Sequence, residues 1–247
     1  TLTPFFLCLT VASALWGTVI SALTAGVIGE RLGARETLRI TALAYVLSAI
    51  GCAFAWDLPS LIFFRFLGGL GIGGSSVLGP LYIAELAPAK WRGRLVGLFQ
   101  INIVVGILLA YFSNYLIGLA IQGSTEWRWQ LGVSGIPALL FLLMLFGIPR
   151  SPRWLVAKGL EQEAREVLNK TSIGDAEAEL QEIIVSINEA KAAQAAKLFT
   201  PRYKFPIFLA IATGAFNQLT GINAILYYLN DIFALAGYSK VSSGFQA

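Results

Sequence analysis

Charged residues are scarce in this sequence, and histidine is absent from it. Only 13% of the 247 residues are charged, whereas a soluble domain carries about 25%. Hydrophobic residues make up 56% and the mean hydropathy is +0.70, which favours a lipid environment. The lack of histidine excludes a histidine metal site and a histidine general base. The two cysteines, Cys8 and Cys52, lie in apolar stretches, so we expect free core thiols and no disulfide.

Six long stretches contain no charged residue at all. They are Thr1–Gly29, Ile40–Trp56, Phe66–Ala84, Leu95–Thr125, Trp129–Pro149 and Phe205–Asn230. A helix needs roughly 20 apolar residues to cross a bilayer core of about 30 Å. The sequence therefore predicts an all-α polytopic membrane protein with spans at about residues 5–29, 38–56, 58–84, 95–121, 129–149 and 205–230.

Lysine and arginine fall almost entirely on one side of these spans. That side receives Arg31, Arg35, Arg39, Lys90, Arg92, Arg94, Arg150, Arg153, Lys158, Arg165, Lys170, Lys191, Lys197, Arg202 and Lys204. The other side receives Arg128 and Lys240, while Arg65 lies within a span. Because basic residues accumulate in cytoplasmic loops, we expect the basic side to be cytoplasmic and the first span to run inward. The net charge of +4 then reflects topology, and no nucleic-acid partner is expected.

The segment between the fifth and sixth expected spans, residues 150–204, carries more than half of the charged residues. Apolar residues recur in it at helical spacing, first as Leu160, Ala164, Val167 and Leu168 and then as Leu180, Ile183, Ile184 and Ile187. Asp175 fits the N-cap of the second helix. We predict a small cytoplasmic helical domain, and a solvated linker with partial helicity is the alternative.

The stretch "RFLGGLGIGGSSVLGP", residues 65–80, contains a G-x-G-x-x-G pattern. A dinucleotide site would need a strand before the pattern and a soluble helix after it, whereas here the surroundings are an expected membrane span. Small residues four apart, Gly69 with Gly73 and Gly71 with Ser75, instead favour close contact between helices. The first span carries a comparable series, Gly17, Ser21, Ala25 and Gly29.

Four stretches resemble signatures of the sugar porter branch of the major facilitator superfamily. They are "GVIGERLGARETLR", "RFLGGLGIGG…LYIAELAPAKWRGRL", "IPRSPRWLVAKG" and "FNQLTGINAILYY". The resemblance implies helices two to seven of a twelve-helix, two-bundle transporter. Residues 1–149 would hold helices two to six of the N-terminal bundle, residues 150–204 the cytoplasmic helical linker domain, and residues 205–247 helix seven. We accordingly expect a piece of a longer protein, with helix one and helices eight to twelve as its partners.

A sugar presents many hydroxyl groups, and amide side chains both donate and accept the hydrogen bonds that bind them. Asn217 and Gln218 lie near the middle of a charge-free stretch, and a break at Gly221 would let Asn223 face the same cavity. The resemblance implies a substrate-binding set of Gln100, Asn217, Gln218, Asn223 and Tyr227. The alternative is that these amides only hydrogen-bond between neighbouring helices and stabilise their packing. Asn217 departs from the family, which often has a second glutamine there.

Other residues match gating or coupling positions of the family. Proton-coupled members pair the arginine at the position of Arg65 with an aspartate of helix one, and an ionisable residue inside a span costs roughly 2.5–3.5 kcal/mol. The gating set is Arg65, Tyr228, Glu85, Arg92 and Arg153, and the loop after helix two holds Gly26, Glu30, Arg31, Gly33 and Arg35. The chain departs from the family at Arg150, where the family has an acid, at Glu30 and at Ala34. The resemblance implies a cytoplasmic salt-bridge network that includes Glu85, Arg92 and Arg153. Because of these departures, we expect that network to be weakened or rewired.

The resemblance implies a secondary transporter that carries a monosaccharide across the plasma membrane, as in a bacterial inner membrane, by alternating access. The proton is the candidate coupling ion, and no cofactor or metal is expected. A polyol (inositol-like) transporter and a sugar sensor that does not transport stay open as alternatives. An enzyme is not expected, because histidine is absent and no carboxylate pair lies within a span. An ATP-driven pump is not expected either, because no G-x-x-x-x-G-K-[ST] phosphate loop occurs.

Overall fold

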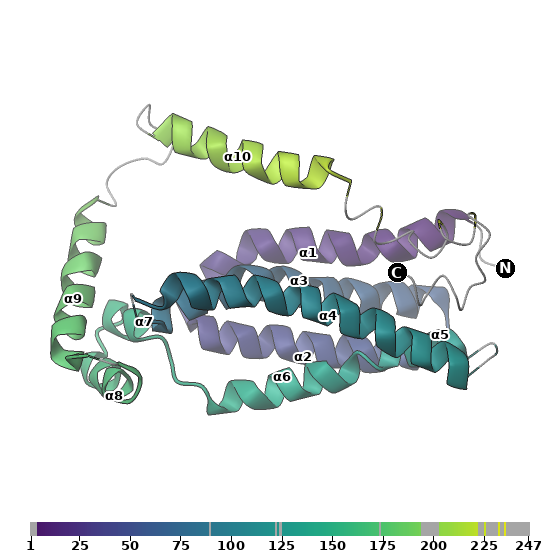
Figure 1. The fold of residues 1–247 in the computed structure, drawn as a ribbon, viewed down its shortest axis with the longest axis horizontal. Coiled ribbons are helices and arrows are strands. Elements are labelled where there is room, and N and C mark those ends of the chain that lie inside the picture. The colour runs from purple at the N-terminus through teal and green to yellow at the C-terminus, as the bar shows by residue number, and fades with distance from the viewer. Residues whose placement is uncertain are drawn as a thin grey trace.

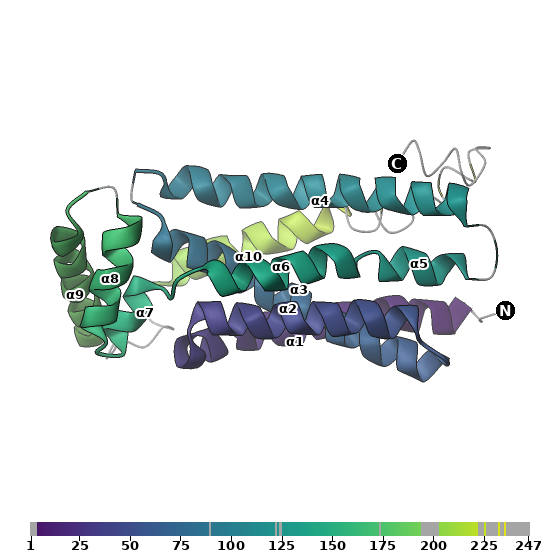
Figure 2. The same ribbon diagram turned by 90° about the horizontal axis from the view of Figure 1, so that it is seen from below.

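The structure is a computed structural model that describes residues 4–88, 90–121, 123, 125–172, 174–193, 203–221, 225, 232 and 235. Every regular element in them is a helix: α1 (Pro4–Leu32), α2 (Ala34–Ala53), α3 (Leu58–Leu86), α4 (Arg92–Ala120), α5 (Glu126–Gly132), α6 (Gly135–Gly147), α7 (Pro152–Ala157), α8 (Glu161–Thr171), α9 (Ala176–Ala193) and α10 (Lys204–Leu219). The helices α1 to α6 run side by side (Figure 1; Figure 2). The end at which α7 to α9 gather is called the linker end, and the opposite end the far end.

Five stretches of the described chain are long and apolar enough to cross a membrane, namely α1, α2, α3, α4 and the α5–α6 stretch. This confirms five of the six expected spans. At the linker end the helices exceed the charge-free stretches, since α1 continues to Leu32 and α2 begins at Ala34. The charged connection expected there is therefore helical on both sides of Gly33. Helix α10 covers the first part of the sixth expected span, and most of the rest lies outside the described residues.

The fifth span is interrupted at Val133 and Ser134, between α5 and α6. Pro137 has no backbone N–H, so the Val133 carbonyl cannot receive the usual helical bond from four residues later. The Ile136 N–H donates to that carbonyl instead, at 3.1 Å. A single tighter turn therefore joins α5 to α6.

Helix α3 lies between α1 and α2 and packs against both. A Cβ atom on Gly69 would meet the carbonyl oxygen of Ala14 in α1, and Gly73 shows the same kind of contact with α1. On the other side, a Cβ atom on Gly71 would lie 3.1 Å from the Thr41 carbonyl oxygen of α2. Only glycine allows helix backbones to approach so closely. The structure confirms that this glycine series serves helix packing.

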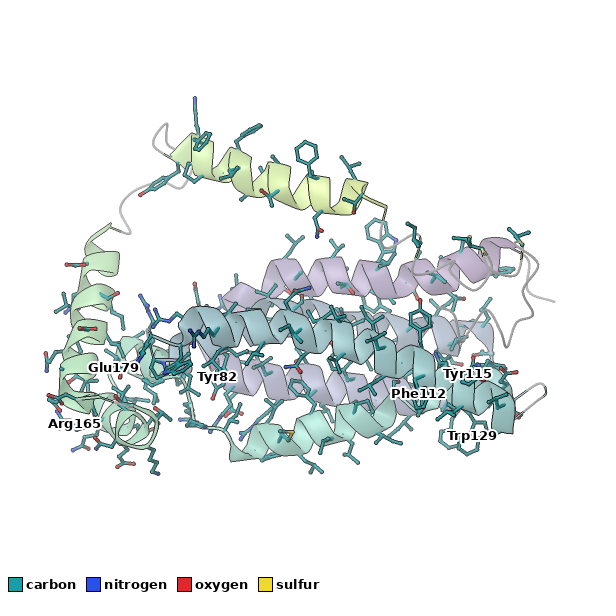
Figure 3. The ribbon with its side chains drawn as sticks, in the orientation of Figure 1. Tyr82, Phe112, Tyr115, Trp129, Arg165 and Glu179 are labelled. Carbon is teal, nitrogen blue, oxygen red and sulfur yellow. The ribbon has the colours of Figure 1, made fainter. Side chains whose placement is uncertain are left out.

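Helix α4 packs against α3 and α5, yet none of its residues is buried. Tyr115 on α4 and Trp129 on α5 lie toward the far end, whereas Tyr82 on α3 lies at the linker end (Figure 3). Along α4 the large apolar side chains are exposed, for example Leu109 and Phe112. The surface of α4 is thus the least used for packing among the five spans.

The helices α7 to α9 form a small domain with its own core. That core consists of Leu155, Val156, Ala164, Leu168, Leu180 and Ile187. The Asp175 carboxylate accepts a hydrogen bond from the Glu177 N–H at 2.9 Å, which makes Asp175 the cap of α9 as expected. Arg165 and Glu177 form an exposed ion pair at 2.9 Å between α8 and α9. The packed core supports the helical-domain prediction, which stays a prediction, and shows that α7 to α9 pack against one another.

Candidate functional site

Arg65 lies in the far half of α3 and reaches α1. Its Nε donates a hydrogen bond to the Thr10 carbonyl oxygen at 3.0 Å. The residue also borders a cavity of about 240 Å³. The walls of this cavity include Tyr45, Ser48 and Cys52 from α2, and Leu131, Ser134 and Ala138 from the α5–α6 stretch. Since no carboxylate lines it, the guanidinium has a carbonyl partner but no counter-charge within the described part of the chain.

Both cysteines are free, as expected. Cys52 is buried in α2, where it borders the cavity of Arg65. The expectation of a core position is wrong for Cys8, whose side chain is exposed on α1. In a membrane-spanning helix an apolar stretch indicates contact with lipid as readily as contact with protein, so hydrophobicity alone did not separate the two positions.

The expected substrate-binding amides are described only in part. Gln100 on α4 and Asn217 on α10 are exposed, and neither side chain has a hydrogen bond within the described residues. Gln218 belongs to α10, whereas Asn223, Tyr227 and Tyr228 lie outside the described residues. Helix α10 ends at Leu219, and Gly221 has a φ of 73°, which only glycine adopts readily. The expected helix break at Gly221 is therefore present.

The connection between α1 and α2 consists of Gly33 alone, with a φ of 92°. A Cβ atom at this position would lie 3.2 Å from the Trp154 indole ring of α7, so both backbone and space favour glycine. The Trp154 Nε1 donates to the Glu30 carbonyl oxygen at 3.1 Å. Gly26 and Arg31 have no such role, since both are exposed on α1, and a Cβ atom on Gly26 would meet nothing within 4 Å.

Glu85, Arg92 and Arg153 line one cavity of about 430 Å³ at the linker end. Acidic residues of the linker domain share its walls, namely Asp175, Glu179 and Glu182, and Figure 3 shows Glu179 at this end. Arg153 Nη2 donates to the Ser186 hydroxyl at 2.9 Å. No ion pair joins Glu85, Arg92 and Arg153 within the described residues. The structure thus brings the three gating candidates together without closing an ionic network.

Arg150, which stands where the family has an acid, points to the linker domain. Its Nη1 lies 3.6 Å from the Glu163 carboxylate of α8. Its guanidinium also lies 5.9 Å from the centre of the Trp154 ring. This position is therefore linked to α8 by a charge opposite to the one that the family pattern supplies.

Sequence reasoning missed a polar cluster at the linker end of α6. The Glu36 carboxylate accepts from Arg35 at 2.6 Å and from Arg39 at 3.0 Å, and the Tyr82 hydroxyl donates to the Pro149 carbonyl at 2.6 Å. The available signal was the spacing R-E-x-x-R, which places Glu36 and Arg39 one turn apart at the start of a span. The Pro149 carbonyl lies 67 positions from Tyr82 in the sequence, so spacing alone could not reveal this partner.

Residues 5–246 match the family described as "Sugar (and other) transporter". The glucose transport protein of Synechocystis sp. is 37% identical over 95% of this chain and 53% of its own length. The arabinose-proton symporter of Bacillus subtilis is 36% identical over 99% of this chain and 53% of its own length. The chain thus spans about half the length of the curated relatives it matches.

Among solved structures, the fold is similar to that of a proton:xylose symporter bound to 6-bromo-6-deoxy-D-glucose. The TM-score is 0.87 and the identity 34%, over 98% of this chain and 55% of that one. Sequence and fold therefore agree along nearly the whole chain. The chain belongs to the sugar porter family of the major facilitator superfamily.

Proposed function

We propose that the protein of which this chain forms about half is a secondary transporter that carries a monosaccharide across the plasma membrane by alternating access. The observation that carries this proposal is the likeness to a sugar-bound symporter over 98% of the chain. The names of that protein and of the Bacillus subtilis relative both include the proton. We therefore take the proton as the coupling ion.

The proposed arrangement assigns residues 1–149 to helices two to six of the N-terminal bundle, residues 150–204 to the linker domain, and residues 205–247 to helix seven. The linker end is then the cytoplasmic end. Basic side chains support this orientation, because Arg35 and Arg92 lie at the linker end and Arg128 at the far end. The bacterial inner membrane is the proposed location.

The proposed sugar site joins Gln100 of α4 to the amides at the end of α10. Exposure of Gln100 and Asn217, without hydrogen bonds of their own in the described residues, leaves both amides free for hydroxyl groups. The break at Gly221 supports a turn of the following residues toward the same site. Arg65 is the proposed coupling residue, and its partner would be a carboxylate from the rest of the transporter.

The test is uptake of labelled hexoses and pentoses by the full-length protein in proteoliposomes, with and without an imposed proton gradient. We expect uptake that an excess of unlabelled sugar abolishes and that an inward proton gradient drives above equilibrium. Uptake that ignores the gradient would contradict symport but not sugar transport.

The alternatives are outcomes of the same experiment. If inositol-like polyols compete for uptake and aldoses do not, the substrate is a polyol and not a monosaccharide. Saturable binding of a sugar without any counterflow would indicate a sensor. A protein that neither binds nor transports a sugar or polyol would overturn the proposal.

A further inference from the structure

Helix α2 and the α5–α6 stretch run antiparallel and pack against each other. At the linker end, Arg39 of α2 donates from Nε and Nη2 to the Leu145 carbonyl oxygen of α6, at 3.2 and 3.1 Å. Arg35 donates from Nη1 to the Ile148 carbonyl oxygen at 3.2 Å. These carbonyls belong to the end of α6, where no later residue of the helix can donate to them.

The far end shows the reverse arrangement. Arg128 of α5 donates from Nη1 to the Ala53 carbonyl oxygen at 3.3 Å and from Nη2 to the Ala55 carbonyl oxygen at 2.9 Å. Ala53 is the last residue of α2. Each helical stretch therefore supplies an arginine to the C-terminal carbonyls of the other.

These contacts suit the charges that they join. The C-terminal end of a helix carries a partial negative charge, and a guanidinium presents several N–H groups in a rigid plane. At the linker end, the Glu36 carboxylate holds Arg39 in place by accepting a hydrogen bond from its Nη1 at 3.0 Å. Near the far end the two stretches are in close contact, because a Cβ atom on Gly132 would lie 3.0 Å from the Ala53 Cβ. Farther from that end, a Cβ atom on Gly135 would lie 3.4 Å from the Ala49 Cβ.

The same two helical stretches form one wall of the cavity beside Arg65. Ser48 and Cys52 of α2 face this cavity together with Ser134, which lies at the break between α5 and α6. Pro137 removes a helical hydrogen bond at that break, so the α5–α6 stretch is weakest where it meets the cavity. Contacts at both ends of the wall are therefore needed to keep its shape.

We propose that Arg39 and Arg128 are positioning residues that clamp α2 to the α5–α6 stretch and so set the shape of the cavity beside Arg65. The two stretches then move as one body, and the environment of the Arg65 guanidinium depends on contacts at both ends of the bundle. The clamp between α2 and the α5–α6 stretch does not depend on the transport function. Its effect on coupling rests on the proposed function.

Cys52 is a native reporter of this wall, since its side chain is 4% exposed and borders the cavity. The experiment uses the full-length protein with Cys8→Ser and with any cysteine outside this chain replaced, and measures alkylation of Cys52 by N-ethylmaleimide. Arg39→Lys and Arg128→Lys keep the positive charge but lose the planar set of donors. We expect the alkylation rate to rise about tenfold in each variant, equivalent to about 1.4 kcal/mol.

Arg94→Lys is the matched control, because the Arg94 guanidinium lies 5.0 Å from the centre of the Trp91 ring and has no hydrogen bond to a helix end in the described residues. Its alkylation rate should equal that of the parent protein. If Arg39→Lys fails to fold, Glu36→Gln is the substitute variant. It keeps Arg35 and Arg39 and removes only the carboxylate that orients them. An unchanged rate in the clamp variants, or an equal rise in Arg94→Lys, would overturn the proposal.

A second readout is the pH profile of uptake. A changed cavity moves Arg65, which stays charged, relative to the carboxylate proposed as its partner, so both clamp variants should shift the pH of half-maximal uptake. A loss of folded protein would instead lower uptake equally at every pH. A clamp variant whose pH profile matches the parent would contradict the link to coupling. Alkylation requires no transport, so a protein that carries no sugar would still test the clamp.

Discussion

Helices α3 and α4 have the same length, 29 residues, and lie next to each other, yet they use their surfaces in opposite ways. Six residues of α3 are buried, namely Gly69, Gly71, Gly73, Gly74, Leu78 and Tyr82. Four of these six are glycines. No residue of α4 is buried, and the Asn114 Oδ1 atom is enclosed without a hydrogen-bond partner in the described residues. Packing within this chain therefore places α3 but leaves most of α4 to other contacts.

The difference indicates that α3 supports the fold, whereas the exposed surface of α4 is available for contacts with function. Apolar exposure along α4 is compatible with lipid, with helices outside this chain and with the path of a solute. Polar groups on such a surface are candidates for function, because they cost free energy unless a partner or water satisfies them. On α4, Gln100 is such an exposed polar residue, and it belongs to the proposed sugar site.

The largest expected effect compares two glycines. A Cβ atom on Gly73 of α3 would meet the Thr18 carbonyl of α1, whereas one on Gly106 of α4 would meet nothing within 4 Å. Gly73→Val should cost at least about 3 kcal/mol because α1 and α3 must separate, and Gly106→Val should stay within about 0.5 kcal/mol of the parent. Thermal unfolding in detergent, followed by size-exclusion chromatography, measures both. Equal losses would break the comparison.

The next effect compares two leucines. Leu78 of α3 is 0% exposed and Leu109 of α4 is 61% exposed. Leu78→Ala should lower the free energy of unfolding by about 2–5 kcal/mol, because it leaves a cavity between packed helices. Leu109→Ala should have little effect in the same unfolding assay. A large loss from Leu109→Ala would show that α4 is packed in the full-length protein.

A third effect concerns function and concentrates on α4. Gln100→Ala should raise the sugar concentration for half-maximal uptake about tenfold, the loss of about 1.4 kcal/mol expected for one hydrogen bond. Ser113→Ala is the matched control on the same helix, because its hydroxyl already donates to the Ala110 carbonyl at 2.9 Å. Concentration-dependent uptake in proteoliposomes measures both, and equal values for the two variants would remove Gln100 from the site.

The smallest effect is expected at the linker end, in the connection between α6 and α7. Arg150→Glu restores the family's charge and places it beside Glu163, so the Arg150 contact with α8 is lost. We expect a two- to threefold shift toward the outward-open state, since an exposed ion pair is worth about 0.2–1 kcal/mol. Cysteine accessibility on either face measures the balance. Arg165→Glu, which breaks only the pair within the linker domain, should leave that balance unchanged.

Much of the scaffold could be predicted from local patterns. Charge-free length located five spans, glycine spacing located the α1–α3 contact, and the short side chain of Asp175 after a glycine marked the start of α9. Each depends on residues within a few turns of one another. The break at Ser134 was missed, although Pro137 lies three residues after it, because a lone proline within an apolar stretch does not show where the helix will yield.

The candidate site was predicted less completely. Arg65 stood out because a charge in an apolar span is costly, and the structure supplied its cavity and its Thr10 partner. Glu85, Arg92 and Arg153 were matched one by one, and the fold placed them around one cavity. The roles of Arg39 and Arg128 gave no sequence signal, because their partners are backbone carbonyls that any residue could provide.

Composition and charge placement alone account for the membrane class, the number of spans in the described residues and the separate linker domain. Those properties follow from the cost of placing charge in lipid, which is summed residue by residue along the chain. Tertiary structure decided which face of each span is used, where the arginines cap the helices and which side chains share a cavity. The hydrogen bonds from arginines to backbone carbonyls join residues from 55 to 113 positions apart, so only the packed bundle brings them within hydrogen-bonding distance.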